Sequence, residues 1–203
     1  MKASPQEMVR DTERYRLLTS EARQLVDVAK RLPDFVFRRT FARYYAIAYA
    51  YLYREEFGNL LSGLANACHD ETVNYITLDP TPEYFYHETS FYGVISFSPS
   101  DVAERYVLVM HPTRGADKIL AGSNVGMFWG SSLKWSIAGD RISWELAIIG
   151  VSGEIDIPRM SGIRCMSWTE VIDYIKSQYR IKDPSGNIAS EFAKKFLAYY
   201  PSD

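Results

Sequence analysis

The segment LKWSIAGDRISWEL, residues 133–146, constrains the fold more than any other stretch of the chain. Apolar and polar residues alternate on both sides of Gly139-Asp140, a pair that is typical of a two-residue type II′ turn. With this turn, Trp135 lies opposite Trp144, and the large apolar side chains share one face of a hairpin. A slip of one residue would expose both tryptophans, so the sequence predicts a Trp-Trp hairpin in this register.

Other short runs that are typical of β-strands precede this hairpin. Gly, Pro, Ser and Asn separate them, as expected for turns between strands. The predicted strands cover residues 84–88, 92–97, 106–111, 118–121 and 126–129. Together with the hairpin they predict a mostly antiparallel β-meander over residues 84–158.

Helical patterns lie on either side of the predicted sheet. Ser4-Pro5-Gln6-Glu7 has the residues of a helix start, and helical spacing of aromatic residues continues from residue 35 to about 67. Ser167-Trp168-Thr169-Glu170 is a capping box that predicts a helix, and a last helix is expected at 188–199. The order of N-terminal helices, sheet and two C-terminal helices predicts an α+β fold.

The length of 203 residues suits one domain, with a helical part at 1–70, a sheet at 84–158 and C-terminal helices at 167–200. The formal net charge of −2 argues against nucleic-acid binding, which needs a dominant basic surface. With two cysteines and no apolar leader or membrane-spanning run, the chain is expected in the cytoplasm, away from membranes.

Two short motifs, His87-Glu88-Thr89 and His111-Pro112-Thr113, repeat the pattern His-x-Thr on predicted strands. The pair resembles the signature of the two-histidine phosphoesterases. The resemblance covers residues 86–113 and implies that His87 and His111 act as acid and base while Thr89 and Thr113 hold a phosphate. The sequence departs from that family in the short spacing of the motifs and in Pro112, which cannot donate a backbone hydrogen bond within a strand.

No metal ion or cofactor is predicted. His69-Asp70-Glu71 and His87-Glu88 contain possible ligands, but the spacings that hold two ligands on one helix face are missing.

The aromatic content favours a non-enzymatic protein-binding module, such as a stoichiometric inhibitor or an immunity protein. The chain has 15 tyrosines and 4 tryptophans, residues that dominate the energetic centres of protein interfaces. On the predicted helix at 35–57, one flank should be exposed to a protein partner. Its predicted contacts are Tyr45, Tyr49, Tyr53, Arg39 and Arg43.

Two alternatives stay open. The first is a phosphodiester hydrolase that uses the His-x-Thr pair. The second is a small-molecule sensor with an aromatic pocket between the predicted helix at 35–57 and the Trp-Trp hairpin.

Overall fold

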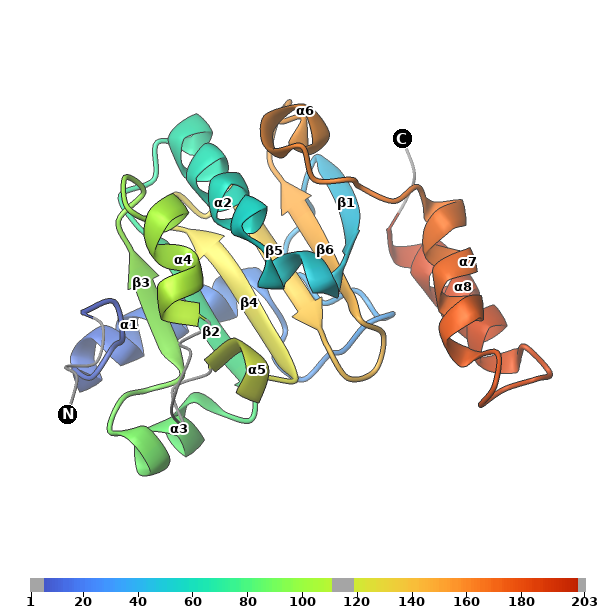
Figure 1. Ribbon diagram of the computed structural model, residues 1–203, viewed down its shortest axis with the longest axis horizontal. Coiled ribbons are helices and arrows are strands. Elements are labelled where there is room, and N and C mark those ends of the chain that lie inside the picture. The colour runs from blue at the N-terminus through green and yellow to red at the C-terminus, as the bar shows by residue number, and fades with distance from the viewer. Residues whose placement is uncertain (1–5, 111–118, 201–203) are drawn as a thin grey trace.

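The computed structural model describes residues 6–110 and 119–200, which form a six-stranded sheet with helices around it (Figure 1). The strand order is β1-β6-β5-β4-β2-β3, and every neighbouring pair is antiparallel. The strands are β1 (Arg43–Ala48), β2 (Val73–Asp79), β3 (Val94–Phe97), β4 (Val125–Gly130), β5 (Trp135–Asp140) and β6 (Leu146–Val151). The predicted α+β class is confirmed.

Helices cover both faces of the sheet. Figure 1 shows α2, α4 and α5 in front of the strands and α1 behind them. The helices are α1 (Thr12–Leu25), α2 (Glu55–Cys68), α3 (Pro82–Thr89), α4 (Val102–Met110), α5 (Ile119–Gly122), α6 (Ile157–Ser161), α7 (Trp168–Tyr179) and α8 (Asn187–Tyr199), with a 3₁₀ helix η1 (Tyr49–Tyr53) after β1.

Each face of the sheet carries its own hydrophobic core. Because side chains alternate along a strand, Ile137 and Ile149 contribute to the front core with α2 and α4. Ala138 and Ile148 contribute to the back core with α1 and α8. All six residues of β5 and all six of β6 are therefore buried, which explains the continuous apolar run of β6, LAIIGV.

The prediction of a helix from residue 35 to about 67 is wrong for the first half of that range. That region contains β1 and η1, and α2 starts at Glu55. In β1, Tyr44 and Ala46 pack in the back core while Tyr45 and Ile47 pack in the front core. A strand with apolar residues on both faces shows no alternation, so its sequence cannot be told from that of a buried helix.

Three of the predicted strands are helices. Residues 84–88 belong to α3, residues 106–110 to α4, and residues 119–121 to α5, whereas His111 and Lys118 lie outside the described residues. Pro82 at the first turn of α3 is a helix-start signal that the strand prediction overlooked. The strands predicted at 92–97 and 126–129 are confirmed as β3 and β4, and β2 was not predicted.

The hairpin exists, but its predicted register and Trp-Trp pairing are wrong. Trp135 lies opposite Val151, and Asp140 lies opposite Leu146, so Gly139 and Asp140 are strand residues. Trp135 is buried in the front core, whereas Trp144 lies between β5 and β6 and packs against the back core.

A close approach of side chains explains why glycine stands at 139. Gly139 pairs with Gly126 across β5 and β4. A Cβ atom at Gly139 would lie 2.8 Å from Cε2 of Tyr49, and one at Gly126 would lie 2.8 Å from Cε2 of Tyr75. The two glycines therefore leave room for two tyrosine rings, rather than forming a turn.

The segment before α1 pairs with the outer edge of β3. The amide of Ser96 donates to the Glu7 carbonyl at 2.9 Å, and the amide of Val9 donates to the Val94 carbonyl at 3.1 Å. The helix predicted to start at Ser4 and Pro5 is not found: both residues lie outside the described part, and Gln6 and Glu7 are not helical. Instead α1 begins at Thr12.

Asp11 caps α1 by accepting a hydrogen bond of 2.7 Å from the Arg14 amide.

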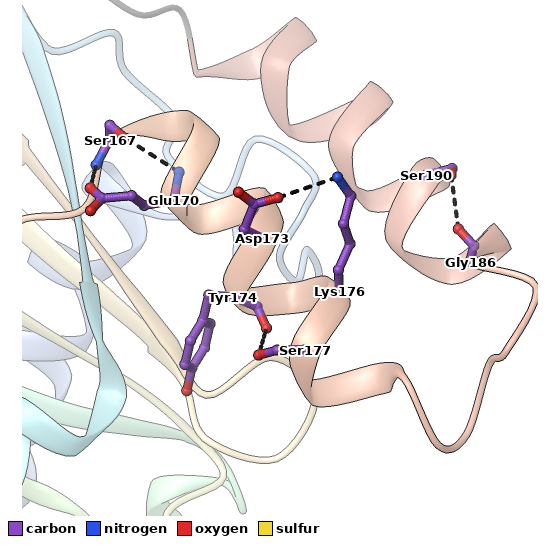
Figure 2. A network of polar contacts seen from close by, with 8 residues as sticks. All are labelled: Ser167, Glu170, Asp173, Tyr174, Lys176, Ser177, Gly186 and Ser190. Atoms are coloured by element: carbon purple, nitrogen blue, oxygen red, sulfur yellow. Dashed lines mark hydrogen bonds and ion pairs between the residues drawn. The ribbon is translucent and has the colours of Figure 1, made fainter.

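The C-terminal helices form a hairpin beside β1 and β6 (Figure 1). The predicted capping box is confirmed, with Ser167 and Glu170 each accepting a hydrogen bond from the other's backbone amide (Figure 2). Phe192 and Phe196 of α8 stack on each other and contact Trp144 and Trp168. This aromatic cluster attaches α8 to the back core.

Replacing Gly126 by alanine should lower the free energy of unfolding by about 1–3 kcal/mol, because the added methyl overlaps Tyr75 in a closely packed core. Urea denaturation measures the change. In a Tyr75→Leu background the same substitution should cost less, since the ring is gone. Equal losses in the two backgrounds would contradict the close approach.

The ion pair of Glu7 with Arg105 should stabilise the protein above the ordinary pKa of glutamate. Nε of Arg105 lies 2.7 Å from Oε1 of Glu7, whose side chain is buried. Burial alone would raise the pKa of Glu7, but the hydrogen bonds and charge of Arg105 hold it below its usual value. The stabilisation is therefore present above that usual pKa and is lost as the pH falls through the lowered one.

Glu7→Gln is therefore expected to reduce the free energy of unfolding by about 1 kcal/mol near pH 7, a modest value because Arg105 is partly exposed. Urea denaturation at about pH 7 and about pH 3 tests this, and the difference should be smaller at the lower pH. Glu104→Gln, at an exposed acid of α4, is the matched control. A loss of equal size at both pH values would rule out the ion pair as its cause.

Candidate ligand-binding cleft beside helix α1

Of the two His-x-Thr motifs, the structure describes only the first. His87 and Thr89 lie on α3 rather than on a strand, and His87 is exposed. The hydroxyl of Thr89 donates to the carbonyl of Phe85 at 2.6 Å, a bond within its own helix. His111 and Thr113 lie outside the described residues, so the proposed acid-base pair stays untested.

Tyr45, Tyr49 and Tyr53 were predicted to form an exposed flank, and this prediction is wrong for Tyr49. Tyr49 is 3% exposed, and Tyr45 is half-buried with its hydroxyl donating to the Ile155 carbonyl at 2.7 Å. Tyr53 is 38% exposed. Because these tyrosines lie on a strand and a 3₁₀ helix, they do not share the flank that a single helix would give them.

Of the two predicted arginines, Arg39 is exposed and donates to the Leu133 carbonyl at 2.9 Å, while Arg43 at the start of β1 is half-buried. Whether any of these side chains contacts a protein partner stays a prediction.

A cleft of about 320 Å³ lies between α1, the loop after it, the end of β2 and the start of α3. Its apolar wall includes Ala22, Val28, Ile76, Leu78 and Pro82. Its polar wall includes Tyr15, Thr19, Arg23, Arg31 and Glu83. The mixture of an apolar floor with a few polar groups is typical of small-molecule sites.

Backbone pairing holds the loop that contributes Arg31. Val26 forms an antiparallel bridge with Phe37, and the amide of Asp27 donates to the Val36 carbonyl at 2.8 Å. Within the loop, Nη1 of Arg31 donates to the carbonyls of Val28 at 2.7 Å and Lys30 at 2.9 Å. These bonds position the guanidinium of Arg31 at the cleft.

Glu83, the acidic residue that lines the cleft, is already hydrogen-bonded within the protein. Tyr15 donates a hydrogen bond to Glu83 and stacks on Tyr92, with ring centroids 4.0 Å apart. Burial and the bond to Glu83 raise the pKa of Tyr15 to about 12, so the phenol stays protonated at neutral pH. Burial alone would raise the pKa of Glu83, but the bond from Tyr15 lowers it below its usual value.

The two arginines of the cleft outnumber its one acid, Glu83. Within residues 6–110 and 119–200, neither Arg23 nor Arg31 forms an ion pair. Despite burial, the bond from Tyr15 and the charge of Arg23 lower the pKa of Glu83, so this carboxyl stays ionised near neutral pH. Two guanidinium groups and one carboxylate therefore leave the cleft with net positive charge.

A narrow slot of about 20 Å³ adjoins the cleft, and Arg31 and Leu78 line both. Asp140 also lines the slot and is 2% exposed. Its Oδ1 accepts a hydrogen bond of 2.7 Å from the Ser143 amide, while its Oδ2 has no partner. Burial raises the pKa of Asp140, and the hydrogen bonds from Ser143 and from the Trp144 backbone, with the charge of Arg31, offset only part of that effect.

A second depression, of about 430 Å³, lies between α7 and the end of β1. Its polar side chains satisfy one another: Arg164 pairs with Glu170, and Asp173 pairs with Lys176 at 3.3 Å. Ser177 donates to the carbonyl of Tyr174, as Figure 2 shows. Because its charged side chains are already paired with one another, this depression is a weaker candidate site than the cleft beside α1.

The described part of the chain gives little support for a metal site or for a reactive cysteine. No three His, Cys, Asp or Glu side chains gather there as metal ligands would. Burial raises the pKa of Cys165 to about 12 and that of Cys68 above its usual value, which disfavours the reactive thiolate.

None of the helices in residues 6–110 and 119–200 is long and apolar enough to cross a membrane.

The cleft residues were missed by sequence reasoning. Arg23, Arg31 and Asp140 belong to no motif, and Asp140 was assigned to a turn. No local signal could have found them, because they are brought together from three segments of the fold. Comparisons with protein-family models, curated proteins and solved structures find no match to this chain.

Asp140→Asn is expected to raise the free energy of unfolding near neutral pH, because a buried charge is removed while the acceptor for Ser143 is kept. With a raised pKa, the contribution of Asp140 to stability is complete below the ordinary value of 3.8 and is lost as the pH rises through the raised one. The gain from asparagine should therefore increase with pH across that range.

Urea denaturation of the wild type and the variant at about pH 4 and about pH 7 checks this expectation. Glu145→Gln, at an exposed acid of the same loop, is the control. A loss of stability at the higher pH would show that Asp140 has a partner that the cleft geometry does not reveal.

Proposed function

We propose that this protein binds a small organic anion in the cleft beside α1. The observation that carries the proposal is the pair of guanidinium groups, Arg23 and Arg31, which line a common cavity and form no ion pair among the described residues. Guanidinium groups bind carboxylates and phosphates through paired hydrogen bonds, and they do so more strongly where water is partly excluded.

The size and lining of the cleft support a small ligand with an apolar body. A cavity of about 320 Å³ is at the small end of the range for small-molecule sites. Ile76 and Leu78 would contact the body of the ligand, while the arginines would hold its acidic group. Tyr15 and Thr19 add hydroxyl groups that can orient the ligand.

This proposal keeps the predicted class of a binding protein and changes the kind of ligand. A macromolecular partner and a cytoplasmic location remain predictions from composition. The burial of Tyr49 reduces the surface assigned to a protein partner. A sensor pocket was predicted between residues 35–57 and the hairpin, whereas the cleft lies beside α1 with Tyr15 as its aromatic lining.

Binding of simple aromatic probes tests the proposal. Benzoate and phenyl phosphate should shift the amide resonances of α1 and of the loop at 26–32 in NMR titrations, while benzylamine should not. Arg23→Ala should weaken benzoate binding about tenfold or more, because a hydrogen bond to a charged group is lost. Arg23 makes no hydrogen bond within the described residues, so the fold should be unaffected.

Arg16→Ala, at an exposed arginine on the same helix, is the matched control and should leave benzoate binding unchanged. The proposal is wrong if the three probes bind equally well, or if the Arg16 and Arg23 variants behave alike.

A further inference from the structure

We propose that the ligand of the α1 cleft carries a hydroxyl group, in addition to its acidic group, and that this hydroxyl enters the adjoining slot and bonds to Asp140. The inference rests on the proposed function and specifies its ligand as a hydroxy acid with a short apolar body. It is carried by the shape of the slot, the unpartnered oxygen of Asp140 and the charges around it.

The slot adjoins the cleft and has room for very little. Arg31 and Leu78 line both spaces, so a ligand held by Arg31 lies at the junction. A volume of about 20 Å³ is enough for one water molecule or one ligand atom of similar size, and too small for a ring. The slot can therefore recognise one small group at the end of a ligand.

Asp140 offers that group a free acceptor. Buried polar atoms are nearly always hydrogen-bonded, and leaving one without a partner costs about 1–3 kcal/mol. Oδ2 of Asp140 has no partner, although the residue is 2% exposed. Apolar side chains such as Val36, Val125 and Ala138 also line the slot, and they strengthen a hydrogen bond formed beside them.

The charges around the slot favour a neutral donor. Lys30 and Arg31 both line it, and their charges would oppose an ammonium group. Asp27 balances them only in part, because it is shared with Arg38, which lies 3.8 Å away. A hydroxyl group can donate to the ionised carboxylate or accept from the protonated acid, so it suits Asp140 in either form.

A comparison of benzoate with 3- and 4-hydroxybenzoate tests the inference. In calorimetric titrations of the wild-type protein, at least one hydroxybenzoate should bind about tenfold more tightly than benzoate, the value of one buried hydrogen bond. Asp140→Ala should abolish this preference. Glu154→Ala, at an exposed acid beyond the other end of β6, should retain it.

A second measurement needs no variant, in case Asp140→Ala fails to fold. The carboxyl ¹³C resonance of Asp140 should shift when the preferred hydroxybenzoate binds and should shift less with benzoate. Equal affinities of the three probes would show that the slot does not recognise a hydroxyl group, and a preference that survives Asp140→Ala would show that the hydroxyl binds elsewhere. The inference would then fail while benzoate binding, and with it the proposed function, would stand.

If none of the three probes binds the wild-type protein, both the inference and the proposed function are wrong.

Discussion

All six residues of β5 and all six of β6 are buried, so the centre of the sheet needs a cover of side chains on both sides. The front cover comes from α2, α4 and η1, and the back cover comes from α1, the loop after it and α8. The back cover is built from separate segments rather than from one layer of helices. The cleft and the slot lie where α1 and its following loop meet the ends of the strands.

Tryptophan side chains set the positions of these covering segments. Nε1 of Trp129 donates to Glu21 of α1 at 3.1 Å, and Nε1 of Trp144 donates to the Leu32 carbonyl at 2.6 Å. Each indole packs its apolar surface in the core while its single donor finds a partner, which orients the segment that supplies the partner. One of these bonds holds α1 and the other holds the loop, and both segments contribute residues to the cleft.

Burial also determines the chemistry of the cleft. Tyr15 donates a hydrogen bond to Glu83, and the guanidinium groups of Arg23 and Arg31 outnumber that single carboxylate. Asp140 retains an oxygen without a partner in apolar surroundings, where a hydrogen bond from a ligand would contribute most. The arrangement suits a ligand with an acidic group at one end and a hydroxyl group at the other, because the arginines and Asp140 can bind these two groups at the same time.

The sequence by itself determined the α+β class, the strands β3 and β4, and the capping box at Ser167, because turn residues and caps act locally. Only the tertiary structure decided that residues 43–48 form a strand and that Trp135 pairs with Val151. A sheet buried on both faces loses the alternation that marks a strand, and its register follows from close packing such as that of Gly139 on Tyr49. The cleft was equally invisible, since its charged residues come from distant segments that meet only in the folded chain.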